Sequence, residues 1–428
     1  QVDAEIMLAS LSQNGFEITN DLEEADVVLV NTCGFIGDAK EESIQAILEV
    51  AEKKNSGKVK KIIVAGCLAQ RYADELISEI PEIDAVVGTG EIHKIEEIVD
   101  TILEDSKIVR CDSFEFLADA GTERILTTNP HTAYLKIAEG CDKHCTYCII
   151  PKIRGDFRSV PMERIVKEAE ELVEQGVREL ILVAQETTLY GKDLDGKESL
   201  PLLLHELCKI EELRWIRILY CYPEEITEEL IQTMKEERKI CHYLDLPIQH
   251  ANDEILKRMG RRTSKEQLIQ VIARLREEIP DITLRTTLIT GFPGETKEQH
   301  EELVDFVDEM EFDRLGVFTY SAEEDTPAAT MPEQVAEEVK EARQEELMEL
   351  QQEIAFARAE DMIGNEVLVM IEGKLSDEDA YVGRTYKDAP NVDGLIFVNT
   401  KEELLSGDFV KVKITGALEY DLIGEVLL

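Results

Sequence analysis

Apolar positions recur with two different spacings in the first part of the chain. Helical spacing is present over 4–14 and again from Asp38 onward. The segments 26–31 and 61–65 are instead short, mainly apolar runs that predict strands. Apolar strands that alternate with helices are typical of a parallel sheet covered on both faces. We therefore predict a parallel α/β domain over 1–110.

The chain begins with Gln1, and its first predicted element is a helix. In a strand-helix-strand design a strand precedes such a helix. We therefore expect a further strand upstream of Val2 that this sequence does not contain.

A second strand-helix series follows the polar stretch 111–130, which we predict to be a linker. Helical patterns such as 163–175 and 265–278 separate its strands. The strands are predicted at 134–138, 179–184, 215–220, 243–247, 283–290 and 315–320. Six such repeats predict a partial parallel (β/α)6 barrel over 131–330.

The last part of the chain changes its pattern again. A charged helix is predicted over 331–360. Alternation with a period of two then predicts strands at 366–371, 395–398 and 409–414. A small all-β barrel over 361–428 would close the chain. The predicted fold class is thus α/β multidomain, with a small β-barrel at the carboxyl terminus.

The strongest chemical signal is a group of three cysteines, Cys141, Cys145 and Cys148, in one loop after the first barrel strand. Three thiolates on a short loop can hold three irons of a 4Fe-4S cluster. The fourth iron then lacks a protein ligand and is open to a small molecule such as S-adenosylmethionine (SAM). A zinc site is the alternative, but zinc normally takes four ligands and only His144 lies nearby.

A second set of cysteines lies in the first domain. Cys33 and Cys67 each follow directly on an apolar strand, and a helix begins soon after each. The helix dipole at that position favours a thiolate, so the pair suggests a second cluster. Two inert, buried thiols are the alternative. The remaining cysteines are Cys111, a possible substitute ligand in the linker, and three that we assign to the barrel core: Cys208, Cys221 and Cys241.

The charge of the chain narrows the choice of partner. Asp and Glu number 91 against 46 Lys and Arg, which gives a formal net charge of −45. Such a surface repels polyanions and attracts basic proteins, although acidity also serves solubility. Nine cysteines in a chain of this size indicate metal ligands in a reducing compartment. We therefore expect a cytoplasmic protein, and no apolar run is long enough to cross a membrane.

The cysteine loop and the residues after it resemble a known enzyme family. The motif Cys141-Asp-Lys-His-Cys-Thr-Tyr-Cys148 continues as Ile-Ile-Pro-Lys-Ile-Arg-Gly and is similar to the radical SAM superfamily. The resemblance implies that Tyr147 lies against the adenine of SAM. It also implies that Gln185 and Glu186, at the end of the second strand, hold the methionine amino group.

A glycine-containing turn, Gly291-Phe-Pro-Gly294-Glu295, ends the fifth predicted barrel strand. Glycines let a backbone approach a bound cofactor closely, and the resemblance places both at the SAM site. The sequence alone also fits a strand-to-helix turn in which Glu295 stabilises the helix dipole. Both interpretations are open at this point.

The resemblance extends over nearly the whole chain. The segments 25–43 and 65–88 are similar to the amino-terminal domain of the radical SAM methylthiotransferases, and the terminal barrel is similar to TRAM domains. That family holds an auxiliary 4Fe-4S cluster through three cysteines, which implies two clusters in all. Cys33 and Cys67 match two of the ligands. The third lies upstream of Val2 in the family, on the strand that this sequence lacks.

The family has two branches with different substrates. One modifies an adenosine in transfer RNA, and the other, the RimO type, modifies an aspartate of ribosomal protein S12. RNA binding needs Lys and Arg, yet 361–428 has 14 acidic and 6 basic residues, a net charge of −8. The segment 381–394 also resembles the RimO type, although alone it fits an ordinary β-hairpin. We therefore expect ribosomal protein S12 as the substrate and disfavour nucleic acid.

The resemblance implies that two molecules of SAM are used. One methylates a sulfur carried by the auxiliary cluster, and the other yields a deoxyadenosyl radical that removes hydrogen from the β-carbon of aspartate. An electron donor such as flavodoxin or ferredoxin is also implied. Four arginines on or near strand ends are candidates to bind the substrate carboxylate: Arg154, Arg158, Arg217 and Arg285. The alternatives are a transfer RNA methylthiotransferase and a non-enzymatic iron-sulfur or zinc-binding interaction module.

Overall fold

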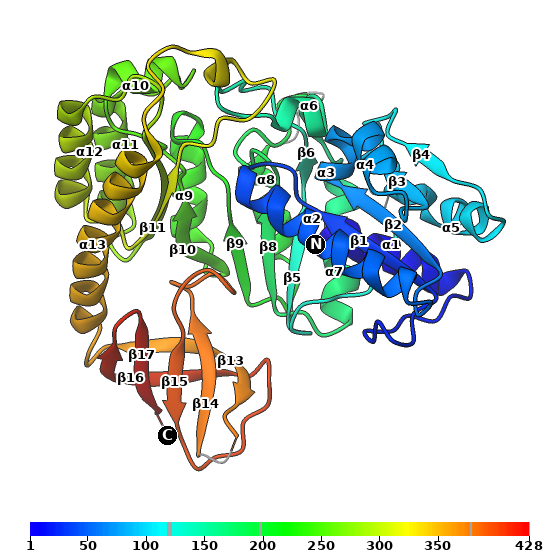
Figure 1. Ribbon diagram of the computed structural model, residues 1–428. Helices are drawn as coiled ribbons and strands as arrows, with labels where there is room; N and C mark the ends of the chain where they lie inside the picture. The colour runs from blue at the N-terminus through cyan, green and yellow to red at the C-terminus, as the bar shows by residue number, and fades with distance from the viewer. Residues whose placement is uncertain (118–121, 195, 197–198, 377–378, 428) are drawn as a thin grey trace. The chain divides into compact units, whose positions relative to one another are not determined.

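The computed structural model describes residues 1–117, 122–194, 196, 199–376 and 379–427 (Figure 1). They form two compact units. Unit 1 comprises Gln1–Thr127, Glu139–Val160 and Ser321–Thr330, and unit 2 comprises Thr128–Ala138, Pro161–Tyr320 and Met331–Leu428.

Unit 1 is built on a parallel four-stranded sheet in the order β1-β2-β3-β4. Its strands are β1 (Val27–Thr32), β2 (Lys61–Gly66), β3 (Ala85–Val87) and β4 (Ile108–Arg110). Its helices are α1 (Val2–Gln13), α2 (Gly37–Asn55), α3 (Cys67–Arg71), α4 (Ala73–Glu79), η1 (Ile92–Lys94) and α5 (Ile95–Leu103). The predicted parallel α/β domain is therefore confirmed.

The two faces of this sheet bury separate apolar clusters. Ile63 and Ala65 of β2 pack in the cluster that includes residues of α1 and α5. Ile62 and Val64, which alternate with them, pack in the cluster that includes residues of α2 and α4. This alternation follows from the two-residue period of a strand. It explains why β2 is apolar throughout rather than on one face only.

The rest of unit 1 comes from two distant parts of the sequence. The first contains the predicted cysteine loop, the helix α6 (Ile150–Arg154) and β7 (Arg158–Ser159), which pairs with β6 (Ala138–Glu139). The second, Ser321–Thr330, ends in η3 (Pro327–Thr330). Both cysteine sets thus belong to one compact unit.

Unit 2 contains a six-stranded parallel sheet in the order β12-β11-β10-β9-β8-β5 (Figure 1). Its strands are β5 (Thr132–Lys136), β8 (Glu179–Val183), β9 (Trp215–Ile218), β10 (Ile240–Asp245), β11 (Thr283–Thr290) and β12 (Arg314–Thr319). The intervening helices are α7 (Met162–Glu174), α8 (Leu200–Cys208), η2 (Pro223–Glu225), α9 (Glu228–Glu236), α10 (Asp253–Arg258), α11 (Lys265–Glu278) and α12 (Lys297–Met310). All six predicted strands are present, so the open, partial barrel is confirmed.

The long helix α13 (Glu337–Asp361) leads to a closed five-stranded barrel, orange to red in Figure 1. The barrel runs in the order β13-β14-β15-β17-β16. Its strands are β13 (Glu366–Lys374), β14 (Ala380–Thr385), β15 (Ile396–Asn399), β16 (Phe409–Leu418) and β17 (Asp421–Val426). The small terminal barrel is therefore confirmed, although β14 was seen only as a possible hairpin strand and β17 was not predicted.

A buried ion-pair network joins this closed barrel to the six-stranded sheet within unit 2. Glu179 of β8 is fully buried and accepts hydrogen bonds from Arg217 Nε at 3.0 Å and Arg384 Nη2 at 2.5 Å. Burial alone would raise the pKa of Glu179, but the two arginines lower it to about 2. Met370 and Trp215 belong to an apolar cluster shared by both sheets. The network therefore fixes the terminal barrel against the sheet.

Among the described residues, no helix combines the length and the apolarity needed to cross a bilayer.

Candidate cluster and cofactor sites

The predicted radical-SAM loop is a tightly constrained turn in unit 1. Gly140 has φ +82°, and a Cβ there would lie 2.1 Å from the carbonyl oxygen of Asp156. The Cys148 N–H donates to the Cys145 carbonyl oxygen at 3.0 Å, which closes the turn between these two cysteines. Cys141 and Cys145 are buried, with exposed fractions of 6% and 4%, and Cys148 is half-buried. The loop thus shields its thiols from water.

The donor set of this loop fits an iron-sulfur cluster. Within the described part of the chain, no three His, Cys, Asp or Glu side chains are grouped closely enough to hold one metal ion. A four-iron cluster differs from one ion because its corners spread three thiolates apart. Three thiols on one short loop, Cys141, Cys145 and Cys148, are the donors that such a cluster needs. His144, the nearby fourth ligand considered for zinc, is exposed.

Cys33 and Cys67 continue two paired strands of unit 1. β1 and β2 are parallel and in register, with Thr32 opposite Gly66, so the two cysteines follow at the same level of the sheet. Gly34 packs on the backbone of the other loop, because a Cβ there would lie 2.8 Å from Leu68 N. A side chain at Gly34 would therefore push apart the two loops that carry the cysteines.

Arg154 lies between the two cysteine sets. It ends α6, six residues after Cys148, and its Nη2 donates to Cys67 Sγ at 3.3 Å. Its Nη1 donates to Asp3 Oδ2 at 2.8 Å and contacts Glu139 Oε2 at 3.3 Å. These carboxylates keep the pKa of Arg154 raised despite its burial. Arg154, a candidate substrate ligand by sequence, thus already binds two carboxylates and a thiol of its own unit.

The ionisation of Cys67 differs from the sequence expectation. Burial raises the pKa of this thiol, and the charge of Arg154 only partly lowers it again. Cys33 and Asp3 nearby raise the pKa further. The helix that begins at Cys67 has only five residues, so its dipole is small and burial prevails. Burial thus opposes the thiolate that the helix dipole was expected to favour.

The other cysteines lie elsewhere. Cys111 follows β4, and its Sγ contacts the carbonyl oxygen of Ala69 at 3.6 Å. Burial raises the pKa of Cys111 to about 11, and β3 separates its strand from β2. Cys221 and Cys241 are buried in unit 2, which confirms their assignment to the core, and Cys208 is half-buried on α8.

The open side of the unit 1 sheet is bordered by a hollow. β1 is an edge strand of the described sheet, without a partner on that side in the ranges that the structure covers. A hollow of about 620 Å³ lies along it, lined by Leu8 and Leu11 of α1 together with Phe16, Val27 and Leu29. The lining also includes polar residues, among them Asn20 and Asn31.

The residues predicted to bind SAM are divided between the units. Tyr147 lies in unit 1 and is half-buried. Gln185 and Glu186 follow β8 in unit 2, where Gln185 is half-buried and Glu186 is fully buried. Thr188 Oγ1 donates to Glu186 Oε1 at 3.3 Å. The end of β8 thus carries two polar side chains, as predicted, and the hydroxyl holds one of them in place.

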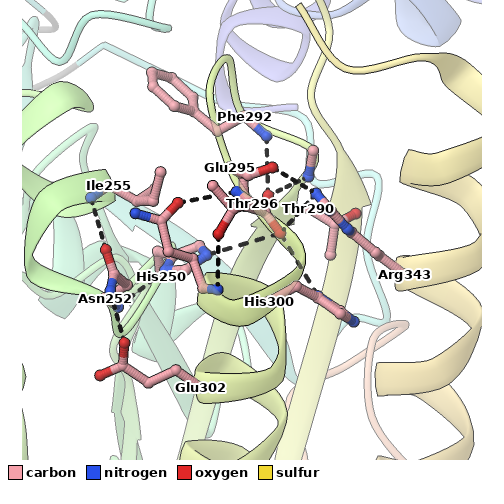
Figure 2. Close-up of polar contacts among 12 residues, drawn as sticks. His250, Asn252, Ile255, Thr290, Phe292, Glu295, Thr296, His300, Glu302 and Arg343 are labelled. Atoms are coloured by element: carbon pink, nitrogen blue, oxygen red, sulfur yellow. Dashed lines mark hydrogen bonds and ion pairs between the residues drawn. The ribbon is translucent and has the colours of Figure 1, made fainter. Parts of the chain in front are cut away.

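The glycines of the turn after β11 are required by the chain itself. Gly291 has φ +68°, and a Cβ there would lie 2.2 Å from Lys340 Cγ. Gly294 has φ +81°, and its Cβ would lie 2.0 Å from Arg258 Nη1. Glu295 accepts a hydrogen bond from the N–H group of Gly291. It accepts another from the N–H group of Phe292 (Figure 2). The structural interpretation of this turn therefore accounts for both glycines.

A buried polar cluster, which we did not predict, surrounds Glu295 (Figure 2). Glu295 Oε1 lies 3.3 Å from Arg343 Nη1, 3.6 Å from His300 Nδ1 and 4.0 Å from His250 Nε2. His250 is fully buried, and burial lowers its pKa to about 4, so the ring is neutral near pH 7. Its Nδ1 accepts the Asn252 N–H at 2.9 Å, which places the proton on Nε2.

The other candidate arginines also contact groups of the chain. Arg158 Nη1 donates to the Asp156 carbonyl oxygen at 2.6 Å. Arg217 is fully buried in the network with Glu179. Arg285 Nη1 donates to Asp245 Oδ1 at 2.9 Å, and its side chain keeps an exposed fraction of 19%. Of the candidates in unit 2, Arg285 is thus the more accessible.

Comparison with known proteins identifies the family. The model of the radical SAM superfamily matches residues 135–307, the TRAM domain model matches 363–427, and an uncharacterised family, UPF0004, matches 1–88. The ribosomal protein uS12 methylthiotransferase RimO of Lachnoclostridium phytofermentans is 62% identical over 423 residues, which cover 99% of this chain and 96% of the relative. The chain belongs to the RimO family. The RimO protein of Clostridioides difficile is 51% identical over 100% of this chain and 96% of its own length.

Solved structures agree with the radical SAM fold of the RimO family. The radical SAM methyltransferase TsrM of Kitasatospora setae, with cobalamin and a [4Fe-4S] cluster bound, has a TM-score of 0.54 at 14% identity and covers 76% of this chain and 73% of TsrM. As a RimO family member, the chain is a transferase, a radical SAM methylthiotransferase that uses a 4Fe-4S cluster and SAM. The hypothesis of a non-enzymatic module was therefore wrong.

Proposed function

We propose that this enzyme attaches a methylthio group to the β-carbon of an aspartate of ribosomal protein uS12. The observation that carries the proposal is the 62% identity, over 99% of the chain, to a protein named for that activity. The net charge of −8 over 361–428 supports it, because this surface attracts a basic protein and repels RNA. Transfer RNA is the alternative substrate.

Two clusters are assigned to unit 1. Cys141, Cys145 and Cys148 hold the radical cluster, and Cys33 and Cys67 hold the auxiliary cluster. When bound, these groups supply the reductive cleavage of SAM and a sulfur that accepts a methyl group. The chain itself buries two thiols of the first set, which keeps water from the reaction.

SAM and the remaining partners are assigned on the same basis. We assign Tyr147, Gln185 and Glu186 to SAM, together with the glycines Gly291 and Gly294 of the turn after β11. Arg285 is the arginine of unit 2 that we favour for the substrate carboxylate, because its side chain is partly exposed. A one-electron donor such as flavodoxin or ferredoxin supplies the reducing equivalent.

The test is a mass measurement on uS12. The full enzyme, reconstituted anaerobically, is incubated with uS12, SAM and a reductant. We expect one methylthio group to replace one hydrogen of an aspartate, and no product from a Cys145→Ala variant. Methylthiolated adenosine in RNA, with unmodified uS12, would contradict the proposal. Iron analysis tests the two clusters, since about eight irons per chain are expected from two four-iron clusters.

A further inference from the structure

The segment Ser321–Thr330, here called the strap, has no role in the assignments above. It follows β12 of unit 2 in the sequence, yet it belongs to unit 1 together with both cysteine sets. Its acidic residues would ordinarily be solvated, since Glu and Asp are rarely buried without a partner. Glu323 departs from this pattern, with an exposed fraction of only 2%.

Glu323 is buried because two cations enclose it. Its Oε2 accepts hydrogen bonds from Arg71 Nη1 at 2.6 Å and from Lys40 Nζ at 2.7 Å. Its Oε1 accepts a hydrogen bond from Ser321 Oγ at 2.8 Å. Burial opposes the charge of Glu323, but these donors keep its pKa below the usual value. The strap is thereby fixed to α2 and α3, which carry the two cations.

Arg71 connects this contact to the auxiliary cysteines. It ends α3, the short helix that begins at Cys67. Its Nη1 also donates to the carbonyl oxygen of Gly34, the residue after Cys33, at 3.1 Å, and its Nη2 donates to the Glu324 carbonyl oxygen at 2.9 Å. One guanidinium therefore joins the loops of both auxiliary cysteines to the strap.

The other end of the strap reaches the radical-SAM loop. The Ala328 N–H donates to the carbonyl oxygen of Thr146 at 2.9 Å. Thr146 lies between Cys145 and Cys148, in the turn that these cysteines close. The strap is thus bonded at one end to the loops of Cys33 and Cys67 and at the other to the loop of the radical cluster.

We propose that Glu323 and Arg71 are positioning residues that set the distance and orientation between the two clusters. The inference rests on the proposed function, in which a substrate radical made at one cluster must meet a sulfur held at the other. Such a meeting depends on placement, and an error of about 1 Å can cost about 100-fold in rate. We assign both residues a positioning role because their contacts described above are with the strap, α2 and the carbonyl of Gly34.

The first test separates coupling from radical formation. Glu323→Gln in the full reconstituted enzyme should keep its iron content and its rate of SAM cleavage to deoxyadenosine. The yield of methylthiolated uS12 per deoxyadenosine should fall about 10- to 100-fold, because the radical is made but the sulfur is misplaced. Glu323→Asp keeps the charge and should restore part of this ratio of product to deoxyadenosine. Arg71→Lys should lower the ratio because an ammonium group cannot make the separate hydrogen bonds of the two guanidinium nitrogens.

The matched control is Glu324→Gln. Glu324 is the exposed neighbour, and its side chain contacts Tyr72 Oη at 3.3 Å. The same loss of charge one residue away should leave the ratio unchanged. An unchanged ratio in both Glu323→Gln and Arg71→Lys would overturn the proposal, and so would a fall in product that only follows a loss of iron.

A second measurement needs no substrate. Pulsed electron paramagnetic resonance on the reduced clusters reports their separation, which should be broader or shifted in Glu323→Gln and unchanged in Glu324→Gln. The distance between the clusters can be measured whether or not uS12 is the substrate. Failure of the positioning role can therefore be told apart from failure of the proposed function. Identical distance distributions in wild type and Glu323→Gln would overturn the positioning role.

Discussion

At the proposed auxiliary site, Arg154 contacts the sulfur of Cys67, a candidate cluster ligand. Asp3 and Glu139 accept from Nη1 of Arg154, and its Nη2 donates to Cys67 Sγ. Reduction adds negative charge to a cluster, and a cationic donor to a ligand sulfur stabilises that charge. The donor belongs to the loop of the other cysteine set, a relation that no sequence spacing reveals.

We therefore expect Arg154→Gln to lower the reduction potential of the auxiliary cluster. One hydrogen bond from a cation to a charged acceptor corresponds to on the order of 50 mV for one electron. The change in reduction potential is measured in a triple variant that lacks the radical cluster, with Cys141, Cys145 and Cys148 all replaced by Ala. Only the auxiliary cluster then contributes to a redox titration monitored by electron paramagnetic resonance. Lys152→Gln, an exposed change on the same helix, is the control. Equal potentials in both variants would refute the role of Arg154.

The buried histidine of unit 2 gives a pH-dependent prediction at the same scale. Glu295, His300, Glu302 and Arg343 carry the charges around it, and burial lowers the pKa of His250 to about 4. The unfolded chain binds the proton near pH 6.5 and the folded chain does not. The stability that neutral His250 contributes is therefore complete above pH 6.5, and it is lost as the pH falls towards 4.

We expect the free energy of unfolding to fall by roughly 2–3 kcal/mol over this range because of His250 alone. Chemical denaturation at several pH values measures it, and His250→Gln should flatten the dependence between pH 6.5 and 4. The control is His205→Gln, at a half-exposed histidine paired with Glu237, and it should leave the pH dependence unchanged. A slope that persists in His250→Gln would show that other groups carry it.

At the scale of elements, local signals determined how well the fold was predicted. α11 and β11 were predicted to the residue. α11 begins at a capping box of Ser264 and Gln267, and β11 is a long strand with buried alternate positions. β3 and β4 have three residues each, which is too short for a period to show. The interior glycine of β17 interrupts its alternation.

The contacts between elements that are distant in the sequence could not be predicted from any local sequence pattern. The cluster at Glu295 brings together His250, His300 and Arg343 from three different segments. The strap was predicted only as part of the barrel domain, whereas it packs in unit 1. The motif of Cys141, Cys145 and Cys148 was visible because its three cysteines are close in sequence. Contacts between segments far apart depend on tertiary packing, which one sequence does not encode in any local pattern.

The docking of the terminal barrel gives a prediction at this scale. Arg384→Met removes one of the two cations on Glu179 and leaves a buried carboxylate partly unpaired. Breaking such a pair costs about 3–5 kcal/mol, so we expect the first unfolding transition to shift to lower denaturant. Lys413→Met, an exposed change in the same barrel, is the control and should be nearly neutral. Equal shifts for the two variants would mean that the network does not stabilise the docking.

At the scale of the whole molecule, the net charge of −45 shapes the encounter with the substrate. A basic protein is drawn to such a surface at low salt, and ions at about 0.15 M screen the attraction beyond roughly 8 Å. The terminal barrel concentrates part of this charge in 361–428, where acidic residues outnumber basic ones by 14 to 6. If uS12 is the substrate, as proposed, this charge should affect its association rather than the chemical step.

We expect the KM for uS12 to rise with ionic strength while kcat stays constant. A triple variant should neutralise three exposed residues of the terminal barrel: Glu402→Gln, Glu403→Gln and Glu419→Gln. We expect it to raise KM by about threefold to tenfold at low salt and only a little at high salt, because salt screens electrostatic steering. The control neutralises three exposed glutamates of unit 1, Glu49, Glu52 and Glu104, with the same change in net charge. An equal rise in KM for both triple variants would mean that the total charge of the molecule, rather than the charge of the terminal barrel, attracts the substrate. A larger effect of the first locates the encounter at the terminal barrel.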